Sequence, residues 1–220
     1  KWNKEIEFSR NKTEQHQLDK ILQQDILSDE SKALSSKSHI YFHYIKGLYY
    51  FFSGNFESSA LHFEQQWLLF REHPHNIEEN KMMYIRTVGN YCLLNIKTGN
   101  IKKFNTGFDV LKTISASNRA ISEYLFYLQY MLSLMRLVRN NEFSEAVELI
   151  NNNMNGIQSL NAIPSEDWYL SWMYVSFDSV SAYMGIGDHD NALKTINDFL
   201  NTANPKLKQD SYCIARVINL

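Results

Sequence analysis

The amino-acid sequence predicts an all-α fold, on three observations. The 220 residues include only 8 Gly and 3 Pro, whereas an all-β protein needs turn residues about every ten positions. Apolar residues make up 44% of the chain, enough at this length to bury a sizeable core. These apolar residues recur at spacings of three and four, the pattern of a helix with one buried face. Helices are therefore expected throughout the chain.

The N-terminal residues 1–38 are expected to hold one helix without a partner, a half-hairpin. One face of a helix in residues 14–27 carries four apolar side chains: Leu18, Ile21, Leu22 and Ile26. No upstream segment offers a second helix to cover this face.

Four helix–turn–helix pairs are predicted next. They lie at about residues 39–75, 76–117, 118–160 and 164–204, with turns at Gly54-Asn55, Gly99-Asn100, Asn141-Glu142 and Gly187-Asp188. Gly gives the backbone the freedom to reverse direction in a turn. A small residue early in the second helix, such as Ser59, Ala146 or Ala192, allows the two helices of a pair to approach closely.

The second helices of the first two pairs carry clear apolar stripes. The stripe after the first turn consists of Phe56, Ala60, Phe63 and Trp67, and the stripe after the second turn of Ile101, Phe104, Phe108 and Leu111. Phe104 stands where the other pairs have Ser or Ala. We therefore expect Phe104 either to widen the second pair or to fill a gap left by its neighbour.

Proline and polar residues predict where the pairs begin and end. Pro74 ends the first pair because proline cannot continue a helix and disfavours helical geometry in the residue before it. Asn76, with Glu79 three residues later, predicts the N-cap of the second pair. Pro164 opens the fourth pair, and Pro205 closes it.

The last residues, 205–220, predict a second half-hairpin. Tyr212, Ala215 and Ile218 begin an apolar face that stops at Leu220. Because stacked helix pairs need polar terminal faces for solubility, this stripe suggests a fragment of a longer protein. It also suggests self-association through uncapped terminal helices.

The pairs resemble the tetratricopeptide repeat, whose two helices carry a small residue, an aromatic residue, Gly-x-aromatic, Ala and an aromatic residue at fixed offsets. The resemblance covers most of residues 39–204. The spacing between successive turns is 45, 42 and 46 residues, measured at Gly54, Gly99, Asn141 and Gly187, whereas the standard repeat has about 34. With this longer spacing, the chain resembles the divergent long-hairpin bacterial type of the repeat. The resemblance implies a single domain, a right-handed superhelical solenoid whose first helices line a concave groove.

Charge and composition narrow the function classes. With 22 Lys and Arg against 24 Asp and Glu, the chain has no basic field for nucleic acid, and no apolar run is long enough to span a membrane. A local basic stretch, Lys97, Lys102, Lys103 and Lys112, is expected to be a solvated face. The two cysteines form no framework or paired metal motif, which favours a reduced, cytoplasmic location. We expect no nucleic-acid and no membrane partner.

The chain offers no catalytic constellation and no cofactor motif. His39 and His43 are spaced to share a metal on a helix, but no Glu follows His39 as in a zinc protease, so both are expected at the surface or hydrogen-bonded. His62 is isolated in sequence, and His189 is expected to pack against its hairpin. There is no nucleophile elbow and no phosphate loop, since Gly185-Ile186-Gly187 joins two helices. We predict no enzyme, no cofactor and no metal.

The resemblance places candidate binding residues on the first helix of each pair. They are Tyr41, Tyr44 and Phe51, then Arg86 and Lys97, then Met131, Met135 and Arg139, and finally Tyr174 and Phe177. Aromatic residues, Met and Arg recur in binding surfaces, although such stripes also form cores. The expected function is a non-catalytic scaffold for a protein or peptide. The alternative is a ligand-responsive regulatory module that controls an output domain outside this chain.

Overall fold

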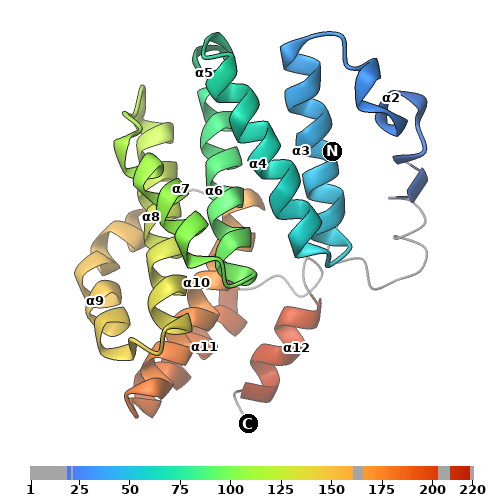
Figure 1. Cartoon of the computed structure of the whole chain (residues 1–220). Helices are drawn as coiled ribbons and strands as arrows, with labels where there is room; N and C mark the ends of the chain where they lie inside the picture. Colours follow the sequence, from blue (N-terminus) through green and yellow to red (C-terminus); the bar gives the residue numbers. More distant parts are fainter. Residues whose placement is uncertain (1–18, 21, 161–165, 203–208, 219–220) are drawn as a thin grey trace. The chain divides into compact units, whose positions relative to one another are not determined.

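The computed structural model describes residues 19–20, 22–160, 166–202 and 209–218, and every regular element in these ranges is a helix (Figure 1). The elements are α2 (Asp25–Ser28), the 3₁₀-helix η2 (Glu30–Lys32), α3 (Ser36–Phe52), α4 (Phe56–Glu72), α5 (His75–Glu79), α6 (Lys81–Lys97), α7 (Ile101–Thr113), α8 (Arg119–Arg139), α9 (Phe143–Leu160), α10 (Glu166–Gly185), α11 (His189–Thr202) and α12 (Gln209–Ile218). The all-α prediction is confirmed. The predicted residues Leu18, Ile21, Pro164 and Pro205 lie outside the described ranges.

The described residues fall into two compact units. The N-terminal unit extends to Leu125, and the C-terminal unit begins at Phe126, so the boundary lies within α8. Within each unit, the helices that pack extensively are successive in sequence apart from the short α5: α3 with α4, α4 with α6 and α6 with α7 in one, and α9 with α10, α10 with α11 and α11 with α12 in the other.

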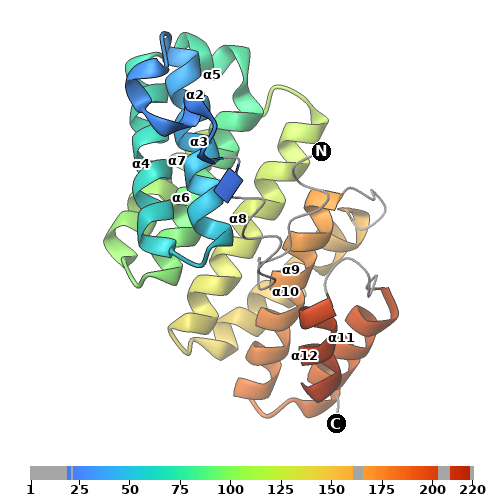
Figure 2. The ribbon, with the colours of Figure 1, turned by 90° about the vertical axis from the view of Figure 1, so that its right-hand side faces the viewer.

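The turns of the N-terminal unit are built as the sequence predicts. Gly54 and Gly99 have φ of 76° and 77°, the left-handed region that Gly adopts without steric cost. The next residues, Asn55 and Asn100, cap α4 and α7, because each side chain accepts a hydrogen bond from the backbone N–H three residues later. Each turn joins the two helices of one pair, α3 to α4 and α6 to α7 (Figure 2).

The start of the second pair differs from the prediction. Asn76 is not the N-cap of a long helix. It lies buried within the short α5, and its Nδ2 donates to Ser36 Oγ at 3.2 Å. Asn80 caps α6 instead, accepting from the Met83 N–H at 3.1 Å. The five-residue helix α5 after Pro74 moves the cap from Asn76 to Asn80, about one helical turn, which the sequence pattern alone does not reveal.

The α3–α4 pair closes around a small residue on each helix. The buried Ser59 donates its hydroxyl to the Gly47 carbonyl at 2.8 Å. The Phe63 ring lies so close to Gly47 that a Cβ there would be 2.8 Å from the ring. Further from the turn, the buried Gln66 of α4 donates its Nε2 to the Ile40 carbonyl of α3 at 3.2 Å. Side-chain hydrogen bonds to backbone carbonyls and the packing of the Phe63 ring on Gly47 therefore hold α3 and α4 together.

Two aromatic contacts join the first pair to the second. Trp67 of α4 lies 4.9 Å, centroid to centroid, from Tyr91 of α6, and Phe70 lies 5.4 Å from Tyr84 in an edge-to-face arrangement. All four side chains are buried. Aromatic pairs of this geometry stabilise beyond the area that they bury, so the α4–α6 contact is a strong junction.

In the second pair, α6 and α7 approach closely although Phe104 occupies the position where a small residue was expected. Phe104 is fully buried and stacks on Phe108 at 5.2 Å, so it fills core space. The close approach between α6 and α7 is made by Gly107, three residues later, where a Cβ would lie 2.7 Å from Cys92 Sγ and 2.9 Å from the Tyr91 ring. The small position has moved by nearly one turn of α7.

Replacing Gly107 with Ala is expected to destabilise the N-terminal unit. In an ordinary helix interior this change gains about 1 kcal/mol of helix propensity. At Gly107 the new methyl group overlaps Cys92 and Tyr91, so we expect a net loss of about 1–2 kcal/mol in the free energy of unfolding. Urea denaturation measures it. An unchanged or higher midpoint would show that α6 and α7 are not in this close contact.

The C-terminal unit repeats the same turn chemistry with one variation. Gly187 has φ of 78°, and Asn141 reaches φ of 59°, in the left-handed region that Asn tolerates better than most side chains. Asp188 accepts from the Asn191 N–H at 3.1 Å at the start of α11. The predicted small residues Ala146 and Ala192 are buried, as are Ile150 and Ile196 of the same stripes: this unit also packs through them.

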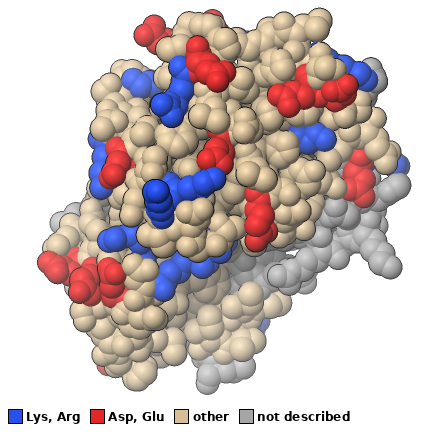
Figure 3. Space-filling view, in the orientation of Figure 1, with Lys and Arg blue, Asp and Glu red and all other residues tan. Residues whose placement is uncertain are grey.

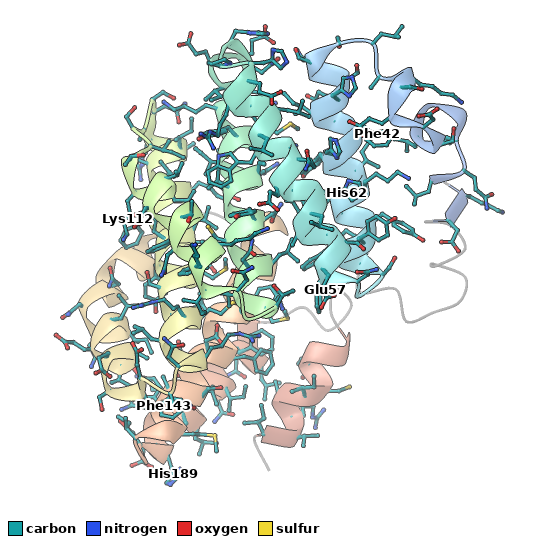
Figure 4. All side chains as sticks on the ribbon, in the orientation of Figure 1. Phe42, Glu57, His62, Lys112, Phe143 and His189 are labelled. Carbon is teal, nitrogen blue, oxygen red and sulfur yellow. The ribbon has the colours of Figure 1, made fainter. Side chains whose placement is uncertain are left out.

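Two residues of the C-terminal unit, Gly185 and His189, have surroundings that the sequence analysis did not predict. Gly185, at the end of α10, is covered by the Phe143 ring at the start of α9, which explains a glycine at this helix end. His189 is exposed at the start of α11 and does not pack against its hairpin, contrary to the prediction (Figure 4). His189 is the first residue of α11, directly after the Gly187-Asp188 turn.

Candidate functional site

The predicted binding residues of the N-terminal unit are mostly engaged within the unit. Tyr41 is exposed, with 39% of its surface accessible, on α3. Tyr44 is half-buried, edge-on to Phe63 at 6.2 Å. Arg86 is half-buried, with its guanidinium 6.0 Å from the Tyr124 ring centroid. Of these three residues, Tyr41 offers the most surface to a partner.

The structure brings two other candidates together around one ring. Phe51 of α3 lies 5.8 Å from Phe56, the first residue of α4, and Lys97 at the end of α6 places its Nζ 5.3 Å from the centroid of that ring. Phe51, Phe56 and Lys97 are all half-buried. A lysine over an aromatic face is stabilised by the ring quadrupole, so this group ties α6 to the α3–α4 turn.

The predicted residues of the C-terminal unit divide by burial. Met131 and Met135 of α8 are buried, and Arg139 at the end of α8 is exposed. Tyr174 and Phe177 of α10 are half-buried, and Phe177 lies 5.4 Å from Phe199. Burial, followed by the neighbouring Asp178 carboxylate, raises the pKa of Tyr174 to about 12. Because Met131 and Met135 are buried, they are left out of the binding surface proposed below.

A polar cluster that the sequence analysis did not predict lies in the N-terminal unit. His43 is buried on α3, and its Nδ1 lies 2.9 Å from Nδ1 of His62 on α4. His62 is labelled in Figure 4. On its other side, His43 Nε2 lies 3.0 Å from Glu30 Oε1 of η2. His39 Nδ1 lies 3.3 Å from the same carboxylate oxygen. We call Glu30, His39, His43 and His62 the histidine cluster.

The electrostatics of the histidine cluster keep its members in defined charge states. Burial acts to raise the pKa of Glu30, but hydrogen bonds from His43 and His39 outweigh it, so the pKa lies below its usual value and the carboxylate is ionised. Burial, then the neighbouring His43 and Lys46, lower the pKa of His62 from 6.5 to about 4. The His62 ring also stacks on Tyr50, at 5.3 Å and an interplanar angle of 11°.

The expectation that His62 is isolated is therefore wrong, whereas the expectation of a hydrogen-bonded His43 is confirmed. A signal for their contact exists in the hairpin itself. Ser59 faces Gly47 across the α3–α4 pair, and one helical turn further from the loop on each helix stand His62 and His43. In two antiparallel helices, residues at about equal distances before and after the turn face each other. Counting outward from the turn on both helices therefore pairs His43 with His62.

The helical spacing of His39 and His43 does not bring them into a metal-binding group in the part of the chain described. Within those residues, no group of three or more His, Cys, Asp or Glu side chains has a geometry that could hold a metal ion. His39 and His43, the pair with suitable spacing, both turn toward the Glu30 carboxylate.

The local basic stretch has partners within the N-terminal unit. Lys103 forms an ion pair with Glu64 at 2.7 Å between α7 and α4. Lys112 pairs with Asp109 at 3.3 Å and lies 4.7 Å from the Phe108 ring centroid. Basic and acidic side chains are interspersed on the face shown in Figure 3. These pairings reduce the positive field that a phosphate backbone would need.

Comparisons with known proteins leave the fold and the histidine cluster to be interpreted on their own. No protein-family model, curated protein or solved structure matches the chain. Among the described helices, none combines the length and the hydropathy that crossing a bilayer requires. The class that the structure defines is an all-α protein of successively packed helices.

Proposed function

We propose that this chain is a non-catalytic scaffold that binds a protein or peptide on a solenoid of tetratricopeptide-like helix pairs. The supporting observation is the order of packing. Within each unit the helices that pack extensively are successive in sequence apart from the short α5, as in repeat proteins, where each repeat contacts its neighbours. The left-handed turns at Gly54, Gly99, Asn141 and Gly187 recur at the four predicted positions, which further supports a repeated unit.

In this proposal each unit binds through the first helices of its pairs, α3 and α6 in the N-terminal unit and α8 and α10 in the C-terminal unit. The residues that suit this binding best are Tyr41 of α3 and Arg139 of α8, which are both exposed. A preordered helix surface leaves the partner to lose most of the conformational entropy on binding. Tyr41 in the N-terminal unit favours an apolar side chain of a partner, and Arg139 in the C-terminal unit favours an acidic one.

Replacing Arg139 with Glu is expected to spare folding but to weaken binding of an acidic partner by at least about tenfold, because charge reversal replaces attraction with repulsion. The measurement is affinity capture from a lysate of the source organism, with parent and variant proteins compared by quantitative mass spectrometry. Tyr41→Ala is tested beside it.

Matched controls separate the proposed surface from general surface effects. Arg71→Glu makes the same charge reversal at an exposed position on α4, the second helix of its pair, and Leu61→Ala removes an exposed side chain from α4. The proposal expects proteins that both controls retain and that Arg139→Glu or Tyr41→Ala loses. Equal retention by all five proteins contradicts the proposed surface.

A further inference from the structure

The contact between His43 and His62 limits how many protons the two rings can hold. Their Nδ1 atoms are 2.9 Å apart, a hydrogen-bond distance. One of the two nitrogens must therefore carry a hydrogen, and the other must offer a lone pair. If both carried a hydrogen, two donors would face each other and the contact would break.

A count of protons gives two states that the cluster accommodates. With both rings neutral, His62 Nδ1–H donates to His43 Nδ1, and His43 Nε2–H donates to the Glu30 carboxylate. With one added proton, His43 becomes an imidazolium that donates to Glu30 and to His62, and an ion pair with Glu30 results. A second added proton places a hydrogen on each Nδ1 and leaves no arrangement that keeps the contact.

The surroundings of His62 also oppose that second proton. Lys46 and His43 face it from α3, and Glu30 faces it from η2 with the opposite effect. Tyr50 of α3 stacks on its ring. Burial has the largest effect and His43 and Lys46 act in the same direction, so the pKa of His62 lies near 4 while the contact is closed.

His43 couples two contacts, because it meets α4 through Nδ1 and η2 through Nε2. Only 7% of its side-chain surface is exposed. Rupture of the contact with His62 leaves a buried Nδ1–H of His43 without an acceptor, which is costly. Turning the His43 ring toward water would relieve this cost, but it would also break the contact between Nε2 and Glu30.

We propose that the His43–His62 contact is an acid-sensitive clamp that holds η2 and α4 against α3 and releases η2 when both rings are protonated. The clamp is a property of the first helix pair and does not depend on the proposed scaffold function. Tyr49 OH donates to Asp19 Oδ1 at 2.9 Å, a contact that involves no member of the histidine cluster, so Asp19 should stay attached to α3. The expected release is therefore local to η2 and the adjoining residues.

The sign of the pH effect follows from the two states of His62. Its pKa is near 4 when the clamp is closed and near 6.5 when the ring is free. The closed state is thus fully favoured above pH 6.5 and loses stability as the pH falls toward 4. Between pH 7 and pH 5, the closed-to-open ratio is expected to fall by roughly tenfold or more.

Amide hydrogen exchange tests the clamp on the whole chain. Protection factors, corrected for intrinsic exchange, are measured at pH 7 and pH 5 for Lys32 and Ala33, whose N–H groups bond within η2. The parent should lose protection by about tenfold at pH 5. His62→Gln can still donate to His43 but cannot titrate, so its protection should be equal at both pH values.

His189→Gln removes an exposed histidine from the C-terminal unit and should behave as the parent. An equal loss of protection in His62→Gln and the parent, or no loss in the parent, overturns the clamp. An NMR titration of the His62 ring in the parent adds a readout that needs no variant. An apparent pKa well below 6.5 supports the clamp, and titration at about 6.5 overturns it.

Discussion

Replacing Phe63 with Ala is expected to lower the free energy of unfolding of the N-terminal unit by about 2–4 kcal/mol. The ring is 1% exposed, covers Gly47 at van der Waals contact or closer, and meets Tyr44 edge-on. Its removal leaves a cavity between α3 and α4 that Gly47, which has no side chain, cannot fill. Chemical denaturation followed by circular dichroism measures the change.

Leu61→Ala is the matched control for Phe63→Ala. Leu61 lies two residues earlier on α4 and is 58% exposed, so its truncation should change the free energy of unfolding by less than about 0.5 kcal/mol. Similar effects of the two variants, or an unchanged midpoint for Phe63→Ala, would mean that α4 does not present this face to α3.

Replacing Ala146 with Phe should destabilise the C-terminal unit by about 2–3 kcal/mol, for the opposite reason. Ala146 is fully buried on α9, so a ring at this position has no space and forces side chains or helices apart. The same denaturation experiment measures the loss.

Glu148→Phe introduces the same ring at an exposed position on α9, two residues later. It should leave the free energy of unfolding within about 0.5 kcal/mol of the parent value. If Ala146→Phe is as stable as Glu148→Phe, then Ala146 is not the small residue at a close helix contact, and the predicted register of α9 is wrong.

The sequence predicts the local features of this fold well because their causes are local. Left-handed φ at Gly54 and Gly187 follows from the residue type and from the apolar stripe that begins just after each turn. The caps at Asn55 and Asn100, which the sequence analysis did not predict, are also local, because each contact joins residues three positions apart. Such features need no knowledge of distant parts of the chain.

Features that depend on packing are predicted less well. Phe104 occupies an expected small position, yet it is buried because Gly107 supplies the close approach to Cys92 instead. Asn76 carries a capping pattern, but a short extra helix moves the cap to Asn80. In both cases one helical turn of displacement preserves the periodicity on which the sequence analysis depends.

The candidate binding residues illustrate the same limit. Periodicity places Met131 and Arg139 on one helix, α8, but only packing decides that Met131 is buried and Arg139 exposed. His62 shows the reverse case, since a residue isolated in sequence becomes part of a cluster once α3 and α4 fold back on each other. Burial and long-range polar contacts are properties of the assembled helices.

The measurement that tests the central claim most directly is amide hydrogen exchange of the whole chain, with and without a partner obtained by the affinity capture described above. The scaffold account predicts that the partner slows exchange in the first helices of the pairs, α3, α6, α8 and α10. It predicts little change in the second helices, α4, α7, α9 and α11. Slowed exchange confined to the second helices, or none with the partner at saturating concentration, would contradict the account.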